Sequence, residues 1–137
     1  MALYLAIDLG TTGCRSILFD EKLTQLRDSY REYGLITPRE NWVEQDANLW
    51  WTLTLETAKE ALQDADRTSV EGISISSQGI TLVPVDGDLN PLHKGINWLD
   101  ARAKEEAVQI TEDFGTEYMF ELTGKPDKID AFLTMFK

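Results

Sequence analysis

The sequence predicts an α/β fold in which helices pack against a mixed sheet. Three observations carry this prediction. Short apolar runs separated by a Gly-rich turn open the chain and indicate strands. A helical stripe of apolar residues follows between positions 47 and 65, and further strand patterns then lead into a second helical stripe. Strands on both sides of a helix favour one sheet with helices packed against it.

The first two strands are predicted at the amino terminus. Leu3 to Ile7 is a continuous apolar run closed by Asp8, as expected for a strand covered on both faces. The residues Gly-Thr-Thr-Gly at positions 10–13 interrupt the run, and Arg15 to Phe19 resumes it. We therefore expect two strands joined by a tight turn. A third extended segment is expected between Leu23 and Ile36, where no helical stripe emerges.

A helix from about Ala47 to Ala65 is the clearest local prediction. Asp46 suits its N-cap, because a short side-chain oxygen can accept hydrogen bonds from the first turn's amides. Apolar residues spaced by four, three, four and three then share one helical face. They are Trp51, Leu55, Ala58, Leu62 and Ala65.

The later elements follow from shorter patterns. Strands are expected at Val70 to Ile75 and at Thr81 to Val85, where Pro84 indicates an edge or a strand end. An Asp-Gly turn at 86–87 predicts a hairpin that leads into Leu92 to Trp98. A second helix is expected after Asp100 and is predicted to stop at Gly115. Its shared face is formed by Ala103, Ala107, Ile110 and Phe114. The segment Asp130 to Lys137 resembles the start of another helix without a cap, which indicates a cut chain.

Composition narrows the function classes. The formal net charge of −11 argues against a nucleic-acid partner, because binding a phosphate backbone needs a basic face. The single cysteine, Cys14, cannot form an internal disulfide, which fits a reducing compartment. No apolar run approaches the roughly 18 residues that span a bilayer, and the amino terminus lacks the basic segment of a signal peptide. We therefore expect a cytoplasmic protein without a membrane partner.

The turn at residues 10–13 is the most informative stretch for chemistry. Glycines let a backbone fold tightly and bring its amides close to a phosphate, and Thr11 and Thr12 add hydroxyl donors. Asp8 ends the first strand and could hold Mg²⁺, directly or through its waters. Arg15 offers a planar cation just beyond the turn. The alternative is an ordinary hairpin in which Asp8 caps the turn. The stretch is neither a P-loop nor a dinucleotide-binding fingerprint, since no Gly-Lys-Ser/Thr follows and a strand replaces the helix.

Residues 6–15 resemble the first phosphate motif of the actin-like ATPase superfamily, which includes sugar kinases, actin and heat-shock chaperones. The resemblance implies an RNase H-like lobe of mixed sheet and flanking helices, whose hairpin closes on nucleotide phosphates. Three further stretches resemble the FGGY family of carbohydrate kinases and extend the match from Ala6 to roughly Gly124. These are Asn41 to Asp46 with Trp50 and Trp51, Gly72 to Gln78, and Asn97 to Arg102.

The family resemblance implies transfer of the γ-phosphoryl group of ATP to a hydroxyl of a sugar, ketose or related polyol. Mg²⁺ is expected on Asp8, and the ATP phosphates on Gly10, Thr11, Thr12 and Arg15. Gln78, Gly79, Trp98 and Asp100 are expected to hold the acceptor. The residues alone leave other roles open: Trp98 as a core aromatic, Asp100 as a helix cap, and Arg102 as a structural ion-pair partner. The run from Glu44 to Asp46 reads as a polar helix entrance.

The acceptor is narrowed by two departures from the better-known branches. Gly79 and Ile80 stand where glycerol kinases carry an Arg-Glu pair and where xylulose kinases tend to carry Met-His. Glycerol is therefore not expected as the acceptor, and D-xylulose is in doubt. A pentulose, hexulose, deoxy-sugar or aldonate stays open.

The resemblance also implies that part of the enzyme is missing. Residues 1–137 correspond to the amino-terminal portion of the first kinase domain, so the lobe is incomplete. The family's general base, an Asp, is expected beyond Lys137, and the chain alone is expected to be inactive and capable of forming a homodimer. Two rival hypotheses are an actin- or chaperone-type ATPase lobe, and a non-catalytic remnant that binds a sugar or a partner.

Overall fold

The computed structural model describes residues 1–124, which divide into two units. The first unit comprises Met1–Gly34 and Asp46–Gln78. The second comprises Leu35–Gln45 and the described residues from Gly79 onward. The helix predicted at 130–137 lies outside the described residues.

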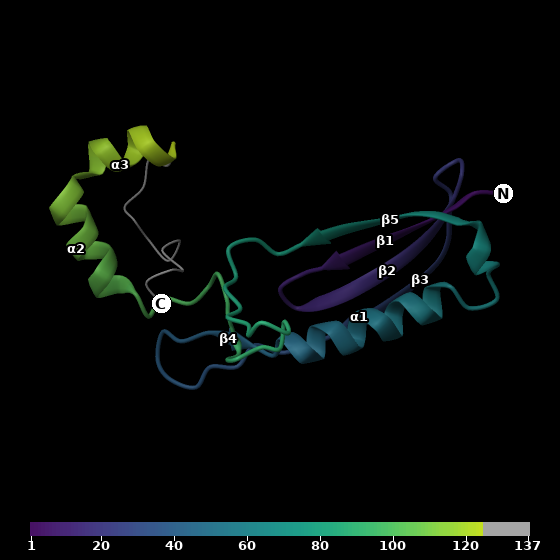
Figure 1. Cartoon of the computed structure of the whole chain (residues 1–137), viewed down its shortest axis with the longest axis horizontal. Helices are drawn as coiled ribbons and strands as arrows, with labels where there is room; N and C mark the ends of the chain where they lie inside the picture. Colours follow the sequence, from purple (N-terminus) through teal and green to yellow (C-terminus); the bar gives the residue numbers. More distant parts are fainter. Residues whose placement is uncertain (125–137) are drawn as a thin grey trace. The chain divides into compact units, whose positions relative to one another are not determined.

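A four-stranded mixed sheet forms the first unit, in the order β3-β2-β1-β5 (Figure 1). Strands β1 (Leu3–Leu9), β2 (Gly13–Asp20) and β3 (Gln25–Glu32) are successive antiparallel neighbours. Strand β5 (Val70–Ser77) returns parallel to β1, with Ile7 opposite Ile75. The predicted mixed sheet is confirmed, and the third extended segment contains β3.

Helix α1 (Ala47–Ala61) covers one face of this sheet. Its predicted N-cap is confirmed, since the Asp46 side chain accepts hydrogen bonds from the amides of Asn48 and Leu49. Leu5 and Ile7 of β1 form the core with Ala61 of α1. The expectation that β1 is covered on both faces is wrong for the described residues. Tyr4 and Asp8, on the other face of the strand, are exposed.

The face of α1 that meets the sheet matches the predicted stripe only in part. Ala58 and Leu62 of that stripe pack against the core. Thr57 and Ala61 are fully buried, whereas Trp51 is 65% exposed. The Thr57 hydroxyl lies 2.9 Å from that of Ser16 on β2, in a buried hydrogen bond. Small residues on both elements thus allow a close approach of helix and sheet. The helix also ends at Ala61, before the predicted Ala65. A 3-10 turn, η1 (Arg67–Ser69), leads from there to β5.

The second unit contains a two-stranded sheet and two helices. Strand β4 (Glu44–Gln45) pairs antiparallel with β6 (Gly95–Ile96). The strands predicted at 81–85 and 92–98 shrink to β6 and isolated bridges, of which one joins Val85 to Pro91. Proline supplies no amide donor to a longer ladder. The Asp-Gly turn is present, because Asp86 accepts hydrogen bonds from the amides of Asp88 and Asn90.

Two helices close the described part of the second unit. Helix α2 (Lys104–Phe114) ends at Gly115, which has a φ of 77° and confirms the predicted stop. Helix α3 (Thr116–Thr123) follows directly. Among residues 1–124, every helix is too short or too polar to span a bilayer.

Candidate functional site

The turn between β1 and β2 is tightly closed. The amide of Gly10 donates to the carbonyl of Gly13 over 2.9 Å. A Cβ atom at Gly13 would lie 2.6 Å from the carbonyl oxygen of Arg31 on β3, so any side chain there would force the strands apart. Neither turn glycine has a positive φ. The glycine at position 13 is therefore required by close backbone approach and not by a left-handed conformation.

Tyr33 braces this turn from the end of β3. Its amide donates to the carbonyl of Thr12 over 3.0 Å, and its hydroxyl donates to the carbonyl of Gly10. The residue is 7% exposed, and burial, assisted by nearby Cys14 and Asp8, raises the pKa of its phenol. The hydroxyl therefore stays protonated and keeps donating. Tyr33 was not predicted as a site residue, because no local sequence pattern reveals a contact across 23 positions.

Asp8 and Arg15 are partner positions on β1 and β2. Both lie on the sheet face away from α1, because the alternating neighbours Ile7 and Ser16 pack toward the helix. The Arg15 Nε atom lies 3.7 Å from the carboxylate of Asp28, and its guanidinium lies 5.4 Å from the ring centroid of Tyr30. The predicted metal ligand and the predicted phosphate cation thus stand side by side at the turn.

Gln78 follows β5 and lies beside the same turn. The main-chain amide of Gln78 donates to the carbonyl of Leu9 over 2.8 Å. This bond extends the parallel pairing of β5 with β1 by one step. The first unit therefore brings Gln78 together with Asp8 and the turn. The other predicted acceptor residues, Gly79, Trp98 and Asp100, belong to the second unit. A Cβ atom at Gly79 would meet nothing within 4 Å, so packing does not demand glycine there.

Asp100 is buried in a network of charged groups. Its carboxylate accepts hydrogen bonds from the amide of Val43 at 2.7 Å and from the amide of Arg102 at 3.0 Å. The Arg102 Nε atom lies 2.9 Å from each carboxylate oxygen, and Nη2 reaches Glu44 Oε1 at 2.8 Å. The guanidinium also lies 3.7 Å from the ring centroid of Trp42. The prediction that Arg102 is a structural ion-pair partner is confirmed.

The environment of Asp100 keeps it charged. Burial alone raises the pKa of the Asp100 carboxyl, but hydrogen bonds from Arg102 and Val43 outweigh it and hold the pKa below its ordinary value. Burial by itself would lower the pKa of Arg102. Pairing with Asp100 and Glu44 outweighs burial and raises this pKa above its ordinary value. Asp100 does not cap the following helix, because the N-cap of α2 is Ala103.

Trp98 lies in a turn whose end residues, Asn97 and Asp100, are buried. The Asn97 side chain accepts a hydrogen bond from the amide of Leu99 at 2.9 Å and donates to Gln45 Oε1 at 2.7 Å. Asn97 and Asp100 are fully buried, whereas Trp98 is 42% exposed. The alternative of Trp98 as a core aromatic therefore loses support within the described residues. The turn presents an indole at the surface.

The prediction that the run from Glu44 to Asp46 forms a polar helix entrance is wrong for two of its three residues. Only Asp46 stands at a helix entrance, whereas Glu44 and Gln45 are 5% and 1% exposed and form β4. Hydrophilic residue types normally indicate a surface, so their burial could not be read from the pattern. The single histidine, His93, is exposed, and Cys14 is fully buried beside the turn.

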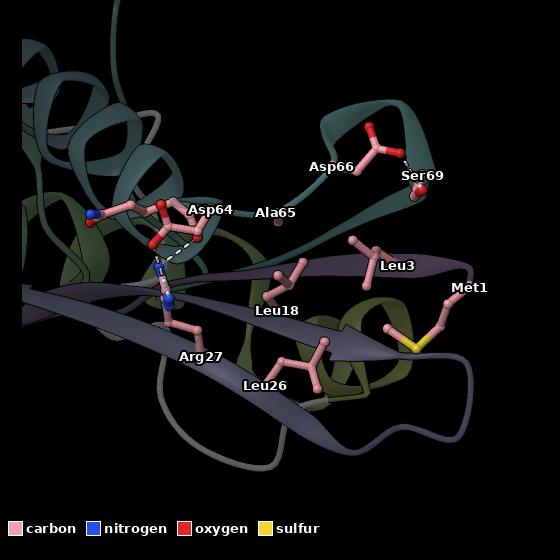
Figure 2. Close-up of a pocket in the computed structure, with 10 residues that line it drawn as sticks. Met1, Leu3, Leu18, Leu26, Arg27, Asp64, Ala65, Asp66 and Ser69 are labelled. Carbon is pink, nitrogen blue, oxygen red and sulfur yellow. Dashed lines mark hydrogen bonds and ion pairs between the residues drawn. The ribbon is translucent and has the colours of Figure 1, made fainter.

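A pocket of about 410 Å³ lies at the other end of the β1–β2 hairpin (Figure 2). Its floor is apolar, with Leu3 and Leu18, and its polar groups pair with one another. Arg27 contacts Asp64 at 3.5 Å, and Ser69 donates to Asp66 at 2.9 Å. None of the predicted site residues lines it.

Comparison with known proteins agrees with this geometry. Residues 3–137 match the model of the amino-terminal domain of the FGGY family of carbohydrate kinases. A glycerol kinase of Marinomonas sp. is 35% identical over 88% of this chain and 25% of its own length. A xylulose kinase of Staphylococcus xylosus is 28% identical over 90% of this chain and 26% of its own length.

The fold is shared with solved kinases. The gluconate kinase of Lactobacillus acidophilus superposes with a TM-score of 0.87 at 23% identity, over 98% of this chain and 27% of that one. The chain therefore spans about a quarter of the length of the proteins that it matches.

Proposed function

The chain belongs to the FGGY family of carbohydrate kinases, and we propose that it supplies part of the first lobe of an ATP-dependent sugar kinase. This kinase transfers the γ-phosphoryl group of ATP to a hydroxyl of a sugar, ketose or related polyol. The observation that supports it best is the braced turn between β1 and β2, with Asp8, Arg15 and Gln78 beside it. A closely packed strand–turn–strand with exposed polar groups at its tip is suited to hold phosphate.

ATP and Mg²⁺ fit the residues at this turn. The Asp8 carboxylate is exposed at the end of β1, and Mg²⁺ takes few protein carboxylates while keeping waters and phosphate oxygens. No cluster of three or more His, Cys, Asp or Glu residues that could hold a metal ion occurs within residues 1–124. Gly10, Thr11, Thr12 and Arg15 would contact the phosphates. The bound ion would neutralise charge that develops on the transferring phosphoryl group.

The acceptor would contact Gln78, Gly79 and Trp98. An amide binds hydroxyls, and an exposed indole offers an apolar plate for the C–H face of a sugar. The names of similar proteins supply three acceptors to test: glycerol, xylulose and gluconate. Glycerol kinases are among the similar proteins. Glycerol is nevertheless not expected as the acceptor, because Gly79 and Ile80 replace the Arg-Glu pair of glycerol kinases.

The general base is proposed to lie outside this chain, within a longer cytoplasmic polypeptide. Similar kinases are about four times as long, and phosphoryl transfer in a closed cleft needs groups from more than one element. We therefore expect residues 1–137 alone to produce no sugar phosphate.

The test is acceptor-dependent formation of ADP by the polypeptide that carries this chain. It would be incubated with ATP, Mg²⁺ and glycerol, D-xylulose or D-gluconate in turn, beside an Asp8→Ala variant. The proposal expects ADP with at least one of these or a related sugar, and a loss of at least about a hundredfold in Asp8→Ala. A matched His93→Ala variant, changed at an exposed position, should keep wild-type activity.

The rival functions give different results in the same assay. ADP formation that ignores every acceptor would indicate an actin- or chaperone-type ATPase. A sugar that raises the melting temperature without any ADP formation would indicate a binding remnant. Either result would overturn the kinase proposal.

Self-association of the isolated chain is part of the proposal. Ile73 and Ile75 on β5 are 63% and 68% exposed, on the edge strand of the described sheet. An apolar strand edge favours pairing with a second copy. Sedimentation of residues 1–137 should show a dimer that Ile75→Lys weakens, and a monomer at all concentrations would contradict it.

A further inference from the structure

The buried charges of the second unit carry an inference about how Trp98 is held. Glu44, Asp100 and Arg102 have side chains that are at most 8% exposed, and the Arg102 guanidinium contacts both carboxylates directly. Burying three charges is costly unless each is paired and hydrogen-bonded. Such a network stabilises little in net terms, but it can specify one local conformation.

The network ties the segment at 43–45 to the turn from Asn97 to Asp100. Val43 donates to Asp100 through its amide and accepts from the amide of Asn97 at 2.9 Å. The amide of Asp100 in turn donates to the carbonyl of Asn97 at 3.0 Å. Both ends of the turn from Asn97 to Asp100 are therefore anchored on the segment at 43–45. Trp98 and Leu99 are the exposed residues between these anchors.

The contacts of Asp100 weigh against a direct role with the acceptor. Its side chain is fully buried, and both carboxylate oxygens already accept hydrogen bonds from Arg102. To bind a hydroxyl, the carboxylate would have to break this pairing and leave a buried guanidinium half-compensated.

We propose that Glu44, Asp100 and Arg102 are positioning residues that set the orientation of Trp98, and that Asp100 does not bind the acceptor itself. This inference rests on the proposed kinase function, in which Trp98 contacts the sugar. A stacking plate must be held rigidly, because a misplacement of about 1 Å near the reacting group can cost a hundredfold in rate. The network supplies that rigidity without touching the substrate.

The kinetic test compares three substitutions in the polypeptide that carries this chain: Glu44→Gln, Asp100→Asn and Arg102→Lys. All three should raise KM for the acceptor by about tenfold while leaving KM for ATP within about twofold. A further variant, Arg102→Gln, should raise KM for the acceptor more than Arg102→Lys does. Lysine keeps the positive charge and loses only the planar fork, whereas glutamine loses both. In the double variant Glu44→Gln/Arg102→Lys, KM for the acceptor should be about equal to that of the more impaired single variant. The two effects should not add, because the two groups act as one unit.

Direct binding by Asp100 predicts another pattern. Asp100→Asn alone would then raise KM for the acceptor, and Glu44→Gln and Arg102→Lys would leave it unchanged. That result would overturn the inference while leaving the kinase function intact.

Absence of kinase activity in the wild type would refute the proposed function. A spectroscopic measurement would still test the orientation of Trp98 in that case. The indole N–H resonance of Trp98, assigned with Trp98→Phe, should move in Arg102→Lys together with that of Trp42. The resonances of Trp50 and Trp51, which lie in the first unit, should stay in place. A Trp98 resonance unchanged in all three variants would overturn the inference without reference to activity.

Discussion

The phenol of Tyr33 donates a hydrogen bond to the main-chain carbonyl of Gly10, in the turn proposed to bind phosphate. The amide of the same residue donates to the carbonyl of Thr12. One residue at the end of β3 thus holds both sides of a turn between β1 and β2. Its side chain also packs near Trp50 of α1, with ring centroids 6.5 Å apart.

Tyr33→Phe should loosen this turn without unfolding the protein. The change removes one hydrogen bond and leaves the part-buried carbonyl of Gly10 without that donor, at a cost of about 1–3 kcal/mol. We expect KM for ATP to rise by roughly fivefold or more, with KM for the acceptor nearly unchanged. Steady-state kinetics and thermal melting would measure the two effects.

Tyr4→Phe is the matched control for Tyr33→Phe. Tyr4 lies on β1 and is 37% exposed, so loss of its hydroxyl should change neither melting temperature nor KM for ATP. Equal effects of the two substitutions would show that Tyr33 has no special role at the turn.

Gly13→Ala should destabilise the sheet. The new methyl group would lie 2.6 Å from the carbonyl oxygen of Arg31, so β2 and β3 would have to separate. The expected cost is about 1–3 kcal/mol, as for other overpacked sites. Urea unfolding would measure it. Gly34→Ala is the control, since a Cβ atom there meets nothing within 4 Å, and equal stability of the two variants would contradict the steric argument.

Asp46→Ala should weaken the start of α1. The Asp46 carboxylate accepts hydrogen bonds from the amides of Asn48 at 2.9 Å and Leu49 at 3.3 Å, and both would lose this partner. A loss of about 1 kcal/mol is expected from urea unfolding followed by circular dichroism. Asp46→Asn should restore most of the loss, because asparagine is an equally good cap. A full loss in Asp46→Asn would point to a different role for this carboxylate.

The stability contributed by Asp100 should depend on pH in a defined direction. Its pKa in the folded protein lies below the ordinary value of 3.8, despite the opposing effect of burial. The contribution is therefore complete above about pH 4 and is lost as the pH falls through the lower folded-state pKa. Asp100→Asn should lower the urea midpoint at pH 7, and the gap from wild type should narrow below pH 4.

The exposed Asp88 provides the control for this pH dependence. Asp88→Asn should leave the urea midpoint close to that of wild type at every pH. A gap between wild type and Asp100→Asn that stays constant down to pH 2 would contradict the assignment.

Much of the fold was predictable because its signals are local. The apolar runs around the turn indicated β1 and β2, Asp46 marked the start of α1, and Gly115 marked the end of α2. Each depends on residues close together in the chain. The motifs also identified the family, since four stretches in the right order are far more specific than any one of them.

The buried polar residues and part of the covered face of α1 were not predictable. Glu44 and Gln45 look like surface residues, and Trp51 looks like a core residue, yet their exposures are 5%, 1% and 65%. Residue type predicts burial only on average, and the partner that a side chain meets decides the individual case. Thr57 is buried because Ser16 lies opposite it, 41 positions away in the chain.

By itself, the sequence determined the first two strands, the start of α1, the tight turn at residues 10–13 and the family. The tertiary structure alone decided that Tyr33 braces the turn and that Asp100 is enclosed by Arg102, Glu44 and Val43. The physical reason is sequence distance, since Arg102 and Glu44 are 58 positions apart and Tyr33 and Gly10 are 23 apart. Periodicity and capping report on neighbours within a few residues, whereas these contacts exist only after the chain has folded.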